Sequence, residues 1–190
     1  MRKYLPHILI ISFVFIAIPI TSATGGSITL RSHYRSLSLG QVQSMANISI
    51  SEKKDWGFYG HSTIDHDYNL KTIGGDNVVV DNATGLMWHQ SGSYYWMIWE
   101  KAKEWIKKLN KSGYAGYYDW RLPTVEEAAS LLESSKKNDL YIDSIFSCKQ
   151  QWIWTGDRNG SEAVWYVDFL LGRVHGLTIS NTVRPVRSER

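Results

Sequence analysis

The chain has 190 residues and a formal net charge of +3, which falls to +1 when the basic residues Arg2 and Lys3 near its start are left out. Hydrophobic residues make up 43% of the sequence and charged residues 21%, which fits one globular domain with some extra sequence better than two domains. Nucleic-acid binding is not favoured, because it normally needs a clustered basic face and this chain is nearly neutral. The single cysteine, Cys148, excludes an internal disulfide, so the core alone must hold the fold.

The first 23 residues have the pattern of a secretory signal peptide. Arg2 and Lys3 precede an apolar run over residues 8–20, and small residues at 21–23 provide a cleavage pattern. An uncleaved membrane anchor is the alternative, although a membrane-spanning helix needs about 20 apolar residues and this run is shorter. We therefore expect an exported protein, periplasmic, secreted or at the cell surface, which contacts a membrane only if this segment stays uncleaved.

Residues 24–72 are predicted to form a loosely packed leader. They are rich in Ser, Gly, His and Asp and lack a sustained periodic apolar pattern. Ser38 and Gln41 form a weak capping box, which predicts one short helix. The folded domain is predicted to span residues 73–190.

This domain is predicted to begin with two strands, at 78–80 and 86–88, joined by a turn. A helix follows over about residues 96–111, because apolar residues recur there at helical spacing and Gly113 stands where a helix would stop. Its lysines near the C-terminal end suit the helix dipole, and an anion-binding patch is the alternative reading of Lys107, Lys108 and Lys111.

A second helix is predicted to start at Thr124, which forms a capping box with Glu127, while Pro123 cannot extend the helix backwards. After Ser135 the pattern indicates a long loop. Four short strands are predicted after it, at 152–155, 163–169, 173–177 and 183–187. Helices followed by a late run of strands indicate an α+β fold with a mainly antiparallel sheet.

Aromatic residues are frequent, with nine tryptophans and 11 tyrosines. Such rings fill cores, and they also stack on the apolar faces of sugars. Four tryptophans on apolar helix faces or in strands are predicted to be core residues: Trp99, Trp105, Trp120 and Trp165. Four tyrosines at the ends of predicted elements are candidates for ligand contact: Tyr94, Tyr95, Tyr114 and Tyr117.

Two stretches carry possible metal ligands. The spacing of the first set matches no zinc pattern, and we interpret it as a solvated loop: His61, Asp65, His66 and Asp67. The second set presents oxygens at alternate positions as a calcium loop does, and a hairpin turn explains it equally well: Asp157, Asn159, Ser161 and Glu162. We expect no metal and no cofactor, with calcium as the alternative.

Catalytic chemistry finds little support in the sequence. The neighbours of Cys148 supply only Lys149 as a possible base, and no nucleophile-elbow, phosphate-loop or dinucleotide motif is present. His89 and His175 lie near predicted strands and would suit an acid-base pair, but nothing in the sequence brings them together.

Six motifs between residues 77 and 187 occur in the order found in a bacterial domain family. They are D-N-A-T-G-L-M-W at 81–88, Trp99 with Ala102, D-W-R-L-P-T at 119–124 with Glu127, W-I-W-T at 152–155, W-Y-V-D-F at 165–169 with Gly172, and V-R-P-V-R at 183–187. With these motifs the chain resembles the DUF1566 family, also called the Lcl C-terminal domain family. The resemblance implies structural roles for Trp88, Trp120, Arg121, Pro123, Thr124, Glu127, Trp165, Arg184 and Arg187.

The resemblance also implies a C-type lectin-like fold, in which two helices flank a small twisted, mainly antiparallel sheet with a long loop region. Formylglycine-generating enzymes share this fold group and hold copper with a cysteine pair, so the single cysteine speaks against their chemistry. Many family members carry cysteines in regions occupied here by Trp105 and Pro185. The adhesin domain that gives the family its name is associated with sulfated glycans and surface attachment.

We therefore expect a non-enzymatic module that binds a glycan, such as a sulfated polysaccharide, through the face formed by residues 135–162. The expected contact residues are Trp152, Trp154, Asp157, Arg158, Asn159 and Glu162. A structural or protein-interaction domain of an envelope assembly is the second hypothesis, and an enzyme related to the formylglycine-generating enzymes is the third.

Arg121 lies between two apolar residues and is expected to be drawn inward. Its charge then requires a carboxylate, because leaving a buried charge unpaired is costly. The candidate partners are Asp119, Glu126 and Asp168.

Overall fold

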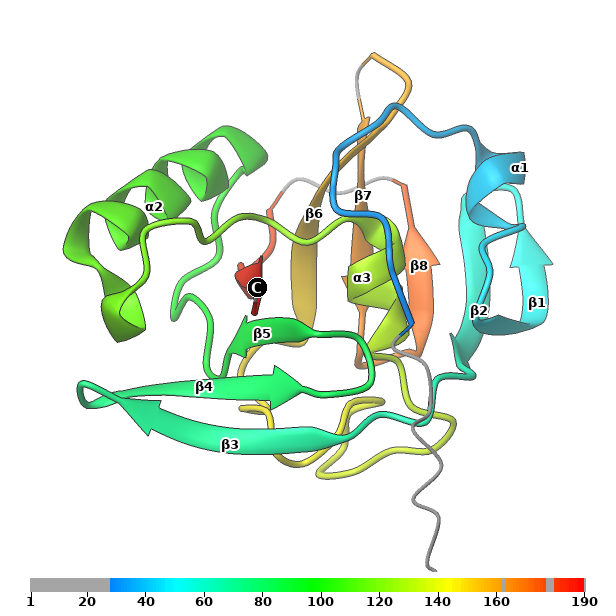
Figure 1. The fold of residues 1–190 in the computed structure, drawn as a ribbon. Coiled ribbons are helices and arrows are strands. Elements are labelled where there is room, and N and C mark those ends of the chain that lie inside the picture. The colour runs from blue at the N-terminus through cyan, green and yellow to red at the C-terminus, as the bar shows by residue number, and fades with distance from the viewer. Residues whose placement is uncertain (1–27, 162, 177–179, 190) are drawn as a thin grey trace, which may run out of the picture.

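The computed structural model describes residues 28–161, 163–176 and 180–189, and its strands form two antiparallel sheets (Figure 1). The five-stranded sheet has the order β1 (Ile48–Lys54), β2 (Gly57–Ser62), β8 (Arg173–His175), β7 (Ala163–Asp168), β6 (Trp152–Asn159). The four-stranded sheet has the order β3 (Tyr68–Ile73), β4 (Asp76–Asp81), β5 (Leu86–His89), β9 (Val186–Ser188). The α+β class and the antiparallel pairing are confirmed, but the expected single sheet is two sheets.

Three predicted helix signals are confirmed, namely the end of α2 and the starts of α1 and α3, whereas α2 begins at Trp99 and not near residue 96. Helix α2 (Trp99–Ser112) ends at Gly113, which has a left-handed φ of 68°, and the short helix η1 (Tyr114–Gly116) follows. Helix α1 (Leu39–Val42) and helix α3 (Val125–Ser130) both start with the predicted capping box, each with its two hydrogen bonds present. None of the helices in the described residues is long and apolar enough to cross a membrane, and the apolar run at 8–20 lies outside those residues.

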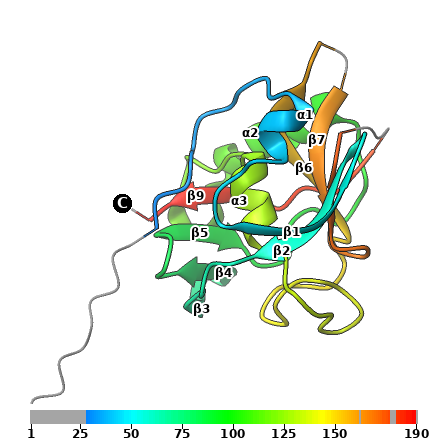
Figure 2. The ribbon, with the colours of Figure 1, turned by 90° about the vertical axis from the view of Figure 1, so that its right-hand side faces the viewer.

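The leader contains more regular structure than expected. Besides the predicted helix α1, the described residues 28–72 form β1, β2 and most of β3. Val42 and Phe58 are fully buried in the main core, so the leader is packed against the rest of the fold. Figure 2 shows residues 28–38 crossing from the four-stranded sheet towards α1. The expectation of loose packing is therefore wrong for the described part of this segment.

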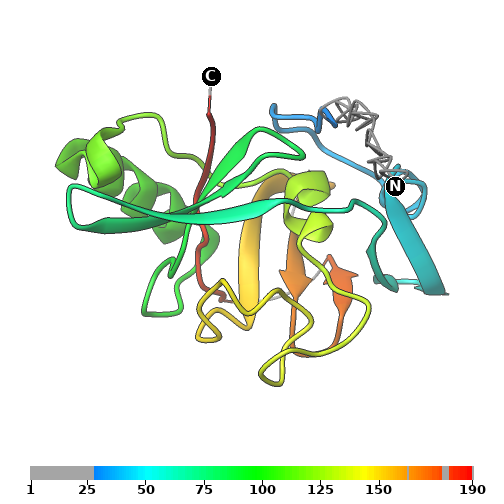
Figure 3. The same cartoon turned by 60° about the horizontal axis from the view of Figure 1, so that its bottom comes forward.

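The main core lies between α3 and the five-stranded sheet. Val125 and Ala128 of α3 pack with Trp165 and Val167 of β7 in one buried cluster. Tyr166 points the other way, since successive strand residues alternate between faces, and it belongs to a second cluster with α2. The loop between α3 and β6 lies beyond one end of this sheet (Figure 3).

The core predictions for tryptophan are confirmed only in part. Trp120 and Trp165 are buried, whereas Trp99 and Trp105 are partly buried and pack on the edge of the second cluster. Of the residues with implied structural roles, Arg121 is partly buried. The others are buried: Trp88, Trp120, Pro123, Thr124, Glu127, Trp165, Arg184 and Arg187. Arg184 donates to the backbone carbonyls of His89 and Ser147, so it ties the long loop to the end of β5.

Arg121 is paired, but not with an expected partner. Its guanidinium donates to both carboxylate oxygens of Glu127, over 2.7 and 2.6 Å. The capping box explains this choice, because it turns the Glu127 side chain back towards the Thr124 N–H and hence towards Arg121. The three expected partners bind other arginines: Asp119 binds Arg187, Glu126 binds Arg31 and Asp168 binds Arg173.

His66 links the four-stranded sheet to α3. Its Nε2 lies 2.7 Å from the Ser130 carbonyl oxygen, and its Nδ1 lies 2.7 Å from Oδ2 of Asp81. Both ring nitrogens thus lie within hydrogen-bond distance of an acceptor oxygen. Its side chain is 6% exposed, so the prediction that His66 lies in a solvated loop is wrong.

Replacing Arg121 with Ala should destabilise the fold strongly. The Glu127 carboxylate is fully buried and would lose its countercharge. Removing one partner of a buried pair costs about 3–5 kcal/mol, whereas an exposed pair contributes roughly 0.2–1 kcal/mol. Urea denaturation should therefore separate Arg121→Ala from Lys101→Ala, which breaks the exposed pair with Glu104. Similar losses in the two variants would contradict this role.

Acid should weaken the link through Asp81. Burial acts to raise the pKa of the Asp81 carboxyl, but hydrogen bonds from His66 and Thr84 and the His66 charge hold it below its ordinary 3.8. Near this pH the native protein binds fewer protons than the unfolded chain. The stabilisation that the ionised Asp81 contributes is therefore complete above the ordinary pKa of 3.8 and is lost as the pH falls through the lowered pKa.

The free energy of unfolding, measured from about pH 6 down to about pH 3, should therefore fall more steeply for the wild type than for Asp81→Asn. Other carboxylates titrate in both proteins, so the difference between the two curves reports the link between Asp81 and His66. Parallel curves would show that Asp81 contributes nothing to the acid sensitivity.

Candidate functional site

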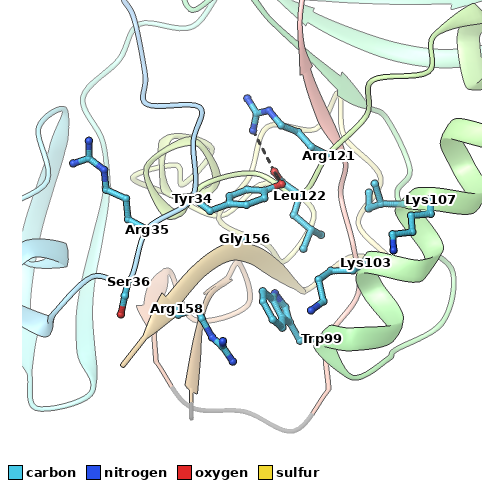
Figure 4. Close-up of a pocket in the computed structure, with 11 residues that line it drawn as sticks. Tyr34, Arg35, Ser36, Trp99, Lys103, Lys107, Arg121, Leu122, Gly156 and Arg158 are labelled. Carbon is cyan, nitrogen blue, oxygen red and sulfur yellow. Dashed lines mark hydrogen bonds between the residues drawn. The ribbon is translucent and has the colours of Figure 1, made fainter. Parts of the chain in front are cut away.

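A cavity of about 510 Å³ lies between leader residues 34–36, helix α2 and strand β6 (Figure 4). This volume is in the range of small-molecule sites, about 300–1,000 Å³. Its apolar walls include Ile106 and Leu122, both from the second hydrophobic cluster. The cavity is therefore open to solvent on one side, and residues of this hydrophobic cluster form its floor.

Basic side chains surround this floor. Arg35, Lys103, Lys107, Arg121 and Arg158 line the cavity, and none of its lining residues is acidic. Arg121 is neutralised by its capping partner. In the described part of the chain, the other four form no ion pair with a carboxylate. This rim therefore presents positive charge that no carboxylate of the described residues neutralises through an ion pair.

Helix α2 places part of this charge by its periodicity. Trp99, Lys103 and Lys107 follow one another at intervals of four, which puts them on one face of the helix. The Trp99 indole N–H donates to the Thr155 carbonyl oxygen over 2.8 Å and so fixes the ring against β6. The Lys103 ammonium lies 3.8 Å from the centre of that ring, and the Arg158 guanidinium 5.2 Å from it. Trp99 thus holds two of the cations near each other by cation–π attraction.

The leader supplies the opposite wall through Tyr34, Arg35 and Ser36. The Tyr34 hydroxyl donates to the Leu122 carbonyl oxygen over 2.9 Å. Burial raises the pKa of this hydroxyl to about 12, so it remains a donor at neutral pH. Arg35 points away from the Tyr34 ring, on the side of the leader opposite to Trp99 and Lys103 (Figure 4).

The side chain of Asp157 holds the leader residues that form this wall. Its carboxylate is fully buried and accepts two hydrogen bonds from the Arg31 guanidinium, over 2.9 and 2.7 Å. It also accepts the backbone N–H groups of Arg35, over 2.6 Å, and Val125, over 2.7 Å. The leader next to the cavity is therefore held by a buried charge on β6.

The expected contact residues divide between core and surface. Trp154 and Asp157 are buried, so neither presents its side chain to a ligand, and the Asp157 oxygens are already used within the fold. Trp152 is partly buried against Trp96. Arg158 lines the cavity, Asn159 ends β6, and Glu162 lies outside the described residues.

The metal and catalytic candidates are not brought together. No group of three or more His, Cys, Asp or Glu residues in the described residues could hold a metal ion. Cys148 is free and exposed. His89 lies in the four-stranded sheet, where burial lowers its pKa to about 3, and His175 lies in the five-stranded sheet.

The candidate tyrosines also divide. Tyr94 and Tyr95 are exposed, at 69% and 74%, whereas Tyr114 and Tyr117 are partly buried against Trp120. These four tyrosines are not among the described residues that line the cavity.

The sequence analysis named Arg158 as a contact residue and Lys107 in the alternative anion-binding patch, and it missed Arg35 and Lys103. The spacing of Trp99, Lys103 and Lys107 was a usable signal, because a helix already predicts that they share a face. Tyr34 gave no signal, because it depends on contacts with residues about ninety positions away, such as Leu122.

Comparison with known proteins supplies the family. The family model of the Lcl C-terminal domain matches residues 77–187, from the start of β4 to β9. No curated protein and no solved structure matches the chain. Since the matched region covers more than half of the sequence, the chain belongs to the Lcl C-terminal domain family, DUF1566.

Proposed function

We propose that this protein is an exported, non-enzymatic binding module of C-type lectin-like fold that holds an acidic glycan in the cavity beside α2. The carrying observation is the rim of Arg35, Lys103, Lys107 and Arg158, cations without carboxylate partners in the described residues. Export rests on the signal pattern of residues 1–23.

The chemistry of the cavity supports binding better than catalysis. A ligand with sulfate or carboxylate groups neutralises the rim, while the floor takes its apolar surface. The lining contains no thiol, carboxylate or imidazole, so the Ser36 hydroxyl has none of the usual carboxylate or imidazole bases beside it among the lining residues. A sulfated polysaccharide satisfies both requirements, because each sugar ring carries acid groups beside an apolar face.

A second candidate function, docking of another envelope protein, is favoured by a separate surface. Tyr94, Tyr95 and Trp96 are exposed, at 69%, 74% and 51%. Their loop is held at both ends, since Ser93 donates its N–H to Val183 and Met97 exchanges backbone hydrogen bonds with Asn181. Exposed aromatics on a fixed loop resemble the anchors of protein interfaces.

Heparin affinity chromatography tests the first candidate. The protein should be retained at low salt and released as salt rises, because the screening length falls from about 10 Å at 0.1 M to about 3 Å at 1 M. Lys107→Gln should weaken binding by up to about fivefold, the range of one exposed ion pair. Lys108→Gln is the matched control, one residue away and not part of the cavity lining. Absence of retention, or equal loss in both variants, argues against the proposal.

A pull-down from envelope extract tests the second candidate. The wild type should capture one protein in stoichiometric amount. Tyr94→Ser with Tyr95→Ser should abolish capture with little change in the melting temperature, because these two side chains are the more exposed ones of the loop, at 69% and 74%. Capture by the double variant at the wild-type level would remove this loop from the interface.

A further inference from the structure

The ring of Tyr34 is exposed and yet fixed. It is 46% exposed at the cavity, although its hydroxyl is bound to the Leu122 carbonyl oxygen. Its other side lies against Gly156 so closely that a Cβ built there would lie 2.0, 2.2 and 2.5 Å from three ring atoms. The Tyr34 ring can therefore occupy this position only because Gly156 has no side chain.

The leader around Tyr34 is equally fixed. Arg35 accepts a backbone hydrogen bond from Arg158 over 2.9 Å, and Leu37 donates one back to Arg158 over 2.9 Å. Arg31 holds the same segment through its pair with Asp157. A ligand that uses the ring of Tyr34 therefore does not have to order it first, which favours binding.

The other aromatic ring of the cavity is differently engaged. Trp99 already interacts with Lys103 and Arg158, whose charges lie 3.8 and 5.2 Å from its ring centre. A ligand ring stacked there would compete with these cations. Tyr34 has no such cation–π partner among the described residues and is free to meet an apolar surface.

From this division of roles we propose that Tyr34 is the ligand-stacking residue of the cavity and makes it selective for cyclic anions with a flat apolar face over linear polyanions. Trp99 positions the cations that bind the acid groups. This inference rests on the proposed function and narrows its ligand to acidic rings, as in a sulfated sugar. It also makes the leader part of the site, because residues 34–36 lie outside the family-matched region 77–187.

Calorimetric titration of the full chain with two probes tests the selectivity. One probe is a heparin-derived hexasaccharide, and the other is a linear inorganic polyphosphate of similar charge. The wild type should prefer the hexasaccharide. Tyr34→Leu should weaken hexasaccharide binding by roughly two- to tenfold, the range of an aromatic contact, and leave polyphosphate binding unchanged. Tyr34→Phe keeps the ring and should keep the preference.

Gly156→Ala tests the same role independently, because it keeps the Tyr34 ring but displaces it. The backbone at Gly156 is not in the left-handed region, so the obstacle to a side chain is Tyr34 itself. This variant should lose the preference as Tyr34→Leu does, and a melting curve for each variant shows that it is folded.

The outcomes separate the two proposals. Equal loss for both probes in Tyr34→Leu, or no loss for either, overturns the role of Tyr34 while the proposed function stands. A wild type that binds both probes equally overturns the selectivity. A wild type that binds neither overturns the acidic-glycan function, and this inference with it.

Discussion

The buried carboxylate of Asp157 is the point at which three distant parts of the chain meet. It lies on β6 and binds the side chain of Arg31 in the leader and the first backbone N–H of α3 at Val125. Because its charge is fully buried, these donors are needed to offset the loss of water, and removing one partner of such a pair costs about 3–5 kcal/mol. The position of α3 on the sheet and the position of the leader beside the cavity therefore depend on the same group.

The distribution of charge follows from this use of acids inside the fold. Asp157, Glu127 and Asp168 are each fully buried, and each binds an arginine. These carboxylates are thus neutralised in the interior, whereas Lys103 and Lys107 on α2 form no ion pair in the described residues. A chain with a net charge of only +3 can in this way form a locally basic surface. The overall charge argued against nucleic-acid binding but gave no information on this rim.

Local signals in the sequence predicted the helices and strands of the family-matched region well. The capping box of α3 and the glycine that ends α2 act over three or four residues, so they can be read from the sequence. The leader strands were missed because β1 combines a short alternation of Ile and Ser with a charged end, a weak strand pattern. The partner of Arg121 was missed because the alternatives depend on which carboxylates other arginines occupy.

The site was predictable only where one element carries it. The face of α2 follows from helical spacing, whereas the wall formed by Tyr34 requires knowing that the leader lies along β6. The strand itself gives the physical reason for that arrangement. The N–H and C=O groups along an unpaired edge strand need partners, and an open edge invites pairing with another chain.

Three short segments cover the edge of β6 in turn. Thr182 pairs near its start, the carbonyl of Pro123 accepts an N–H in its middle, and Arg35 and Leu37 pair with Arg158 near its end. The third of these segments also carries the wall of the cavity. Without it, two backbone groups of β6 and the Asp157 charge would all lose partners, so a change that loosens the leader acts on stability and on the cavity together. In this protein, the same leader segment therefore covers the edge of β6 and forms one wall of the cavity.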